Sequence, residues 1–269
     1  MTNSAKKFGR KADNSDALGI AVRVGLICYG VVHLLIAWLA ASLAFGDNKG
    51  SASKNGALKE VAQQPLGSVL LYVMTAGFAA LVVWQLVETV AGHRDEDGGK
   101  RKLKQASSAL KVAIYGFLGF SSLKVASGGG GGDQTEPMTA RVLALPAGQF
   151  LVGVVGLAVA GYAAALIYRG FSEGFREHLK SQGQTGELGR AYVLLGKVGY
   201  VSKGLALLAV GGLILWAAWS HDPDKSGGLD QALRKVLDQP FGSLMLAVIA
   251  FGIGCYGLFC FARPRHLDR

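Results

Sequence analysis

The sequence predicts an all-α, polytopic membrane protein with six transmembrane helices, built as three tandem two-helix hairpins. The first observation is composition: 51% of the 269 residues are apolar and only 17% are charged, which is typical of membrane proteins. The second is that apolar runs of membrane length recur along the whole chain. The third is that one short pattern containing proline and glycine occurs three times, which indicates internal repeats.

Each apolar run is about as long as the ~20 residues that a helix needs to cross the hydrocarbon core of a bilayer. Because backbone amides have no water partner there, each run is expected to be a helix. The 39 glycines are interpreted as positions where such helices pack closely. The predicted spans are residues 24–45, 66–87, 108–127, 147–168, 194–219 and 241–262.

The repeated pattern defines the hairpin. EVAQQPLGSVLL at residues 60–71 reappears as KVLDQPFGSLML at 235–246 and more faintly as RVLALPAGQFLV at 141–152. Each copy therefore has an inbound span, an external loop, a short amphipathic segment, a Pro-x-Gly hinge and an outbound span. Because each copy crosses the membrane twice, all three have the same orientation, which predicts a pseudo-three-fold arrangement about the membrane normal. The predicted hinge residues are Pro65, Gly67, Pro146, Gly148, Pro240 and Gly242.

The hinge admits two interpretations. Proline is accepted in the first turn of a helix but disrupts it further in, so each proline is expected to begin the outbound span at a sharp angle. Alternatively, the hinge is a re-entrant corner that lines a cavity. Glutamines before the prolines, such as Gln64 and Gln239, could hydrogen-bond the exposed helix starts. In the third copy, Leu229 and Leu233 recur at helical spacing opposite Asp230, which suits a helix in the membrane interface.

These features divide the chain into seven segments. Charged connections separate the three repeats, and a short tail lies at each end. The predicted segments are an N-terminal cytoplasmic tail (1–18), repeat 1 (19–92), a basic cytoplasmic linker (93–104), repeat 2 (105–170), a second cytoplasmic linker (171–193), repeat 3 (194–263) and a C-terminal tail (264–269).

The distribution of basic residues predicts the orientation. Most of the 28 Lys and Arg fall in the N-terminal segment, the connections between repeats and the C-terminal end. An excess of these residues in short loops marks the cytoplasmic side, so both termini are expected in the cytoplasm and the protein in the cytoplasmic membrane. The net charge of +10 is explained by this topology and by contact with anionic lipid, and no nucleic-acid partner is expected.

The repeated residues resemble a known family. A Gly-x4-Gly opening of the inbound span, seen at Gly25 and Gly30 and again at Gly199 and Gly204, is followed in each case by Gln-Pro-x-Gly. This set resembles the DUF1206 family, a group of bacterial, largely actinobacterial membrane proteins built from three such copies. The resemblance covers residues 19 to 263, and the middle copy departs most, since Lys111 replaces the first glycine. It implies the six-span architecture and carries no established activity.

Residues that break the repeat are the candidates for function. His33 lies near the middle of the first span, where an ionisable group is a functional hypothesis by default; the other interpretation is a neutral histidine hydrogen-bonded to a neighbouring helix. Lys203 lies two turns into the fifth span. Its long stem could bring the ammonium to the cytoplasmic interface, or it could form an internal ion pair with Glu88. His33, Glu88 and Lys203 form the candidate intramembrane polar site.

A second candidate set lies at the ends of the outbound spans. Aligning the hinge prolines brings Glu88, Arg169 and Arg263 into register. Under the pseudo-three-fold arrangement, these residues would form a ring of mixed charge at the cytoplasmic mouth. The other interpretation is that each anchors its helix at the membrane interface.

The sequence lacks recognisable enzyme signatures. The sequence has no motif for a catalytic nucleophile, a nucleotide phosphate, zinc or haem, so no catalytic residue, metal or cofactor is expected. The expected partners are the lipid bilayer and either another membrane protein or a second copy of the chain. The leading hypothesis is a non-enzymatic structural or accessory partner of other membrane or envelope components. The alternative is a small channel or permease with a path along the axis between the three hairpins.

Overall fold

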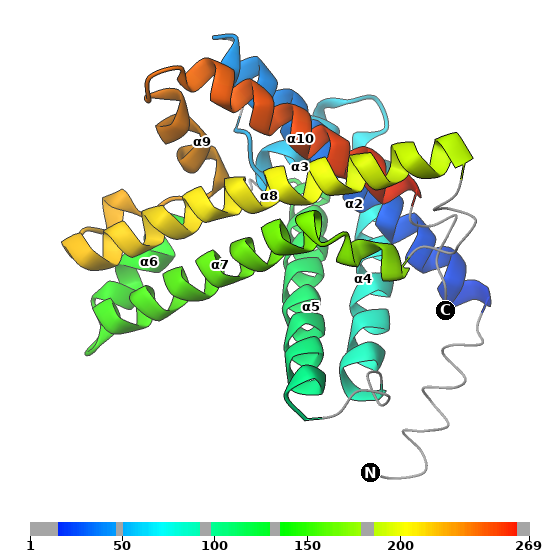
Figure 1. Ribbon diagram of the computed structural model, residues 1–269, viewed down its shortest axis with the longest axis horizontal. Helices are drawn as coiled ribbons and strands as arrows, with labels where there is room; N and C mark the ends of the chain where they lie inside the picture. Colours follow the sequence, from blue (N-terminus) through cyan, green and yellow to red (C-terminus); the bar gives the residue numbers. More distant parts are fainter. Residues whose placement is uncertain (1–15, 47–50, 92–97, 130–134, 179–185, 263–269) are drawn as a thin grey trace. The chain divides into compact units, whose positions relative to one another are not determined.

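A computed structural model of the chain describes residues 16–46, 51–91, 98–129, 135–178 and 186–262 (Figure 1). Every regular element within these residues is a helix, which confirms the predicted all-α fold class. Among the described helices, six are long and apolar enough to cross a membrane. The fold is therefore that of a polytopic helical membrane protein.

Long and short helices alternate in the predicted order. Each repeat contains a long inbound helix, a short helix and a long outbound helix. The long helices are α2 (Asp16–Ala44), α4 (Gly67–Ala91), α5 (Gly98–Ala126), α7 (Gly148–Phe171), α8 (Gly186–Ser220) and α10 (Gly242–Ala262). The short elements are α3 (Lys54–Gln63), α6 (Thr135–Leu143), α9 (Leu229–Leu237) and the 3-10 helices η1 (Gly174–His178) and η3 (Pro223–Lys225).

The inbound helices begin earlier than the sequence predicts. Helix α5 starts at Gly98 and α8 at Gly186, inside segments expected to be linkers, and α2 starts at Asp16, inside the expected tail. These segments contain good helix formers such as lysine, leucine, glutamine and alanine, so a helix can continue into water. Helix α8 has 35 residues. At 1.5 Å per residue its length is about 52 Å, which exceeds the thickness of the hydrocarbon core.

The described chain forms two compact units that do not follow the repeat boundaries. Unit 1 contains residues up to 29 and residues 58–130, whereas unit 2 contains residues 30–57 and 131–268. Helix α2 is continuous and contributes its first part to unit 1 and its second part to unit 2. The predicted pseudo-three-fold arrangement involves both units and stays a prediction.

In unit 1, α4 and α5 run side by side (Figure 1). The first part of α2 packs on α4 through two glycines, because a Cβ placed on Gly77 would lie 3.0 Å from the Cα of Gly25. The buried Ser122 of α5 donates a hydrogen bond to the carbonyl oxygen of Leu71 in α4 at 2.9 Å. Close backbone approach and interhelical hydrogen bonds are the usual means by which membrane helices associate.

In unit 2, α8 packs along α7 on one side and against α10 on another (Figure 1). Gly204 allows α8 to approach α7, since its Cβ would lie 2.9 Å from the carbonyl oxygen of Ala163. The second part of α2 packs on α10 in the same manner: a Cβ on Gly30 would lie 3.0 Å from the carbonyl oxygen of Gly257. Glycines of the predicted Gly-x4-Gly opening therefore lie at helix crossings in both units.

The short helix α9 packs on the protein. Ala232 and Leu233 on its apolar face are buried, and α9 contacts both α8 and α10. On its other side, Asp230 accepts a hydrogen bond from the backbone N–H of Ala52 at 2.7 Å and pairs with the guanidinium of Arg234 at 2.9 Å. This contact joins the loop after α2, in the first repeat, to the third repeat within unit 2.

Candidate intramembrane polar site

Two of the three predicted site residues meet on one tyrosine. His33, on α2, is only 4% exposed, and its ring centre lies 4.9 Å from that of Tyr256 on α10. The ammonium of Lys203, on α8, lies 4.0 Å from the centre of the same Tyr256 ring. All three residues belong to unit 2. His33 and Lys203 are thus brought together, with Tyr256 as their shared contact.

Glycine contacts place Tyr256 at a three-helix crossing. A Cβ on Gly199 would lie 2.6 Å from both the Cα and the N of Tyr256, so only glycine lets α8 approach α10 at this level. Gly30 allows the corresponding approach of α2 to α10 next to Gly257. The Tyr256 side chain is buried between these helices, which carry Lys203 and His33 toward it.

Tyr256 also belongs to an aromatic cluster formed by Phe175, Tyr200, Tyr256 and Phe259. Tyr200 contacts Tyr256 edge to face, with ring centres 5.2 Å apart, and stacks on Phe175 at 5.3 Å. Phe259 meets both Tyr200 and Phe175 edge to face. Aromatic pairs in these geometries stabilise by about 0.5–1.5 kcal/mol beyond their buried area. The cluster joins η1, α8 and α10.

Electrostatic attraction accounts for a lysine in this apolar setting. The face of an aromatic ring carries partial negative charge, and a cation over it gains about 2 kcal/mol or more where water is excluded. Lys203 therefore has a specific contact inside unit 2, which neither sequence-based interpretation anticipated. Glu88, its proposed ion-pair partner, lies on α4 in unit 1, and its side chain is outside the described residues.

The predicted cytoplasmic-end set is described only in part. Arg169, near the end of α7, lies with its guanidinium carbon 5.8 Å from the centre of the Tyr200 ring. It therefore borders the aromatic cluster and contacts the same tyrosine that packs on Tyr256. Arg263 and the side chain of Glu88 lie outside the described residues, so the predicted ring stays a prediction.

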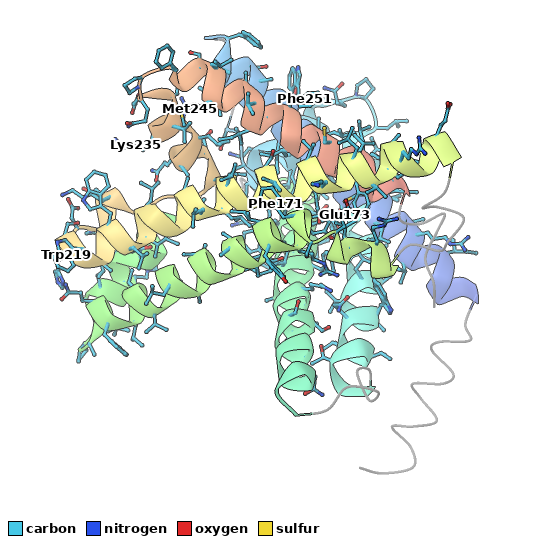
Figure 2. The ribbon with its side chains drawn as sticks, viewed as in Figure 1. Phe171, Glu173, Trp219, Lys235, Met245 and Phe251 are labelled. Carbon is cyan, nitrogen blue, oxygen red and sulfur yellow. The ribbon has the colours of Figure 1, made fainter. Side chains whose placement is uncertain are left out.

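A charged group beside the cluster was missed by the sequence reasoning. Glu173 follows α7, and Figure 2 shows it next to Phe171 where the chain leaves that helix. Its carboxylate accepts from Arg176 at 2.6 Å and lies 3.9 Å from the ammonium of Lys197 on α8. The neighbouring Phe175 is buried against Gly196, which has no room for a Cβ. These contacts fix the start of the second predicted linker onto α8.

The three Pro-x-Gly segments, which we call the corners, share one backbone geometry. In each, the glycine N–H donates to the carbonyl oxygen of the residue before the proline at 2.8 Å. Proline is the first central residue of this turn, and the second central residue has a positive φ. This is the pattern of a type II turn, in which the second position usually holds glycine. The residues in that position are Leu66 (61°), Ala147 (62°) and Phe241 (60°).

The glycine of each corner is required by space. A Cβ on Gly242 would overlap the carbonyl oxygen of Leu237 at the end of α9, and the other two corner glycines meet the ends of α3 and α6 in the same way. The outbound helices begin at these glycines, two residues after the prolines, so each proline lies in the turn before the helix and not in its first turn. The left-handed residue between them cannot belong to the helix. The side-chain amide of Gln239 donates to Lys235, at the end of α9 rather than the start of α10.

The polar site brings together one imidazole, one ammonium and the tyrosine that both contact. Within the part of the chain that the structure describes, no group of three or more His, Cys, Asp or Glu is arranged to hold a metal ion. Cys28, Cys255 and Cys260, all within described helices, are buried and not bridged by a disulfide. The arrangement can bind helices together through polar and aromatic contacts, and it places a positive charge within the apolar spans.

Six apolar helices, alternating with short helices and joined at three equivalent corners, define a polytopic membrane protein made of internal repeats. The family model described as Domain of Unknown Function (DUF1206) matches residues 24–92, 106–173 and 198–265, and the chain belongs to this family. The three matched segments correspond to the three predicted repeats, with slightly different boundaries.

A relative in Bacillus subtilis (strain 168) spans most of the same length. The Uncharacterized protein YxxB is 28% identical over 243 residues, which cover 88% of this chain and 86% of the relative. No solved structure matches the chain. The comparisons therefore support the repeat architecture and assign no activity.

Proposed function

We propose that this protein is a non-enzymatic component of the cytoplasmic membrane that acts as a structural or accessory partner of other membrane or envelope proteins. The observation that carries this proposal is the use made of the intramembrane polar residues. His33 and Lys203 both contact Tyr256 at a crossing of three helices, so each contributes to holding α2, α8 and α10 together. Polar side chains at such crossings strengthen helix association in a bilayer.

The outer faces of the outbound helices support the same role. Phe251 on α10 is 71% exposed, and Figure 2 shows Phe251 and Met245 on this helix. Phe150 on α7 and Tyr72 on α4 are also exposed. In a membrane these side chains are available to lipid or to a neighbouring membrane protein.

Site-specific photo-crosslinking tests the proposal. A benzophenone amino acid is placed at Phe251, Phe150 or Tyr72, one exposed position on each outbound helix, and at the buried Phe259 as the matched control. Irradiation of living cells should give one discrete protein adduct from at least one exposed position and none from Phe259. If irradiation yields lipid adducts alone at all three positions, and the purified protein passes solutes across liposomes, the accessory role is wrong.

A small channel or permease is the second candidate, and a specific observation favours it. Lys203 is an ionisable residue well inside an apolar span, and such residues often mark substrate or ion routes. Liposomes that contain the purified protein should then show flux of an ion or small solute. The flux should fall in Lys203→Met and be retained in Lys203→Arg, since arginine keeps the charge. An equal rate in both variants would exclude a route through Lys203.

A further inference from the structure

Each corner places an unfavourable backbone conformation on a residue that is not glycine. The left-handed region brings the Cβ close to the backbone carbonyl, so L-residues other than glycine avoid it. Leu66, Ala147 and Phe241 adopt it all the same, each between a proline and a required glycine. A glycine in this position would form the same turn without strain. A side chain retained in all three copies at this cost suggests that the side chain itself has a use.

Two of these side chains are also large, apolar and open. Leu66 is 75% exposed and Phe241 is 80% exposed, and the third, Ala147, is exposed as well. The backbone strain and the exposure thus fall on the same residue. In water the strained backbone and the exposed apolar side chain are both unfavourable. In an apolar medium the exposed position of the side chain becomes favourable, because its apolar surface leaves water.

The position of the corners identifies that medium. The membrane-spanning helices α4 and α10 begin at the very next residue in each case. The apolar face of the preceding short helix is already occupied in the third repeat, since Ala232 and Leu233 are buried against the protein. Phe241 is therefore a large apolar side chain of this corner that remains available to lipid, next to the first residue of the span.

Aromatic side chains at the C-terminal end of α8 fit the same kind of environment. Trp219 is 87% exposed, and Figure 2 shows it at the end of this helix. The ammonium of Lys225 lies 5.4 Å from the ring centre of Trp216. Tryptophan and lysine in this combination are typical of the membrane–water interface, where one part of each side chain meets lipid and the other meets water.

We propose that Leu66 and Phe241 are interfacial anchors that insert into the lipid at the boundary between headgroups and acyl chains. The rigid proline and the required glycine hold the left-handed residue between them, so its side chain projects from the corner. The anchors fix the depth at which α4 and α10 start. This inference is independent of the proposed accessory role and of the second candidate function.

Spin-label accessibility tests the inference on the full-length protein in vesicles of phosphatidylcholine and phosphatidylglycerol. The three native cysteines, all buried, are replaced by alanine, and a nitroxide is attached to Leu66→Cys or Phe241→Cys. Asp238→Cys, an exposed position two residues before the proline of the third corner, serves as the matched control. Oxygen concentrates in the acyl region, whereas a nickel chelate stays in water. Labels at both anchors should collide more with oxygen than with nickel, and the control label should show the reverse.

Two results would overturn the inference. In the first, labels at both anchors are as open to nickel as the control, which would place the corners in water. In the second, the labels are shielded from both reagents, which would indicate protein packing. If one cysteine variant fails to fold, the other carries the same test, since Leu66 and Phe241 lie in different units. Phe241→Gly separates the effect of backbone strain from the effect of lipid contact. This variant removes the strain and should fold in detergent, but it should lose the lipid contact in vesicles.

Discussion

The ammonium of Lys203 lies 4.0 Å from the centre of the Tyr256 ring, and the imidazole of His33 meets the same ring at 4.9 Å. The first and third repeats thus share a polar contact around one tyrosine inside unit 2. The ring provides the attractive surface for the cation, so the contact depends on the ring more than on the hydroxyl group.

The ring of Tyr256 is predicted to stabilise unit 2. Tyr256→Leu removes the aromatic face and its edge-to-face contact with Tyr200, and it should destabilise the protein by about 2 kcal/mol or more. Tyr256→Phe keeps the ring and should lose much less. Thermal unfolding in mild detergent, followed by size-exclusion chromatography with fluorescence detection, measures both. Equal losses in the two variants would show that the hydroxyl group, not the ring, matters.

Gly199 is predicted to be irreplaceable, in contrast to another glycine on the same helix. A Cβ on Gly199 would lie 2.6 Å from backbone atoms of Tyr256, whereas a Cβ on Gly212 meets nothing within 4 Å. Gly199→Ala should therefore destabilise by about 1–3 kcal/mol through overpacking. Gly212→Ala should be neutral or stabilise by up to about 1 kcal/mol, because alanine favours helix. The same thermal assay checks the pair, and equal stability would contradict the described helix contact.

Lys54 gives the protein a specific pH dependence. Burial lowers the pKa of Lys54 from 10.5 to about 8, and this residue lies outside the membrane-spanning helices. Between these values the unfolded chain binds more protons than the folded protein, so stability should rise with pH from about 8 to 10.5. Below pH 8 the folded state carries the full unfavourable effect of an ammonium partly withdrawn from water. Lys54→Gln should be more stable than the wild-type protein at pH 7 and should lack this rise. The unfolding temperatures of the two proteins, measured from pH 7 to 10, should therefore converge as the pH rises. Parallel curves would contradict the lowered pKa of Lys54.

Both termini are predicted to lie in the cytoplasm. The basic residues concentrate in the N-terminal segment, the connections between repeats and the C-terminal end. Fluorescent protein fused to either end should fluoresce, and alkaline phosphatase fused to either end should be inactive. A phosphatase inserted in the loop between α2 and α3 provides the positive control. Activity at one terminus only would mean an odd number of crossings and would refute the hairpin topology.

The elements that depend on local composition could be predicted from the sequence. Hydropathy located the six spans, and the Pro-x-Gly pattern located the three corners, since each depends on residues within one short segment. The contacts between helices could not be predicted, because they join residues far apart in the chain. Tyr256 did not stand out, since the register set by the corner prolines aligns it with another tyrosine, Tyr162, and with Leu81.

The backbone of the corners was missed for a different reason. Leucine, alanine and phenylalanine disfavour a positive φ, so nothing in the sequence indicates that Leu66, Ala147 and Phe241 adopt one. Only the space left by the end of the preceding helix requires this turn. Similarly, the contact of Lys203 with a ring was missed because sequence reasoning considered partners of opposite charge, and an aromatic face is a partner without a formal charge.

The packing of Gly30 on α2 against Gly257 on α10 joins the first and the last of the six described spans. While the ribosome is still translating, the face of α2 that carries His33 has no final neighbour and must be tolerated by lipid or held by the insertion machinery. This contact therefore assembles after the last helix has entered the membrane. A premature stop codon before α10 would leave an orphaned first span, and we expect membrane proteases to remove such a fragment quickly.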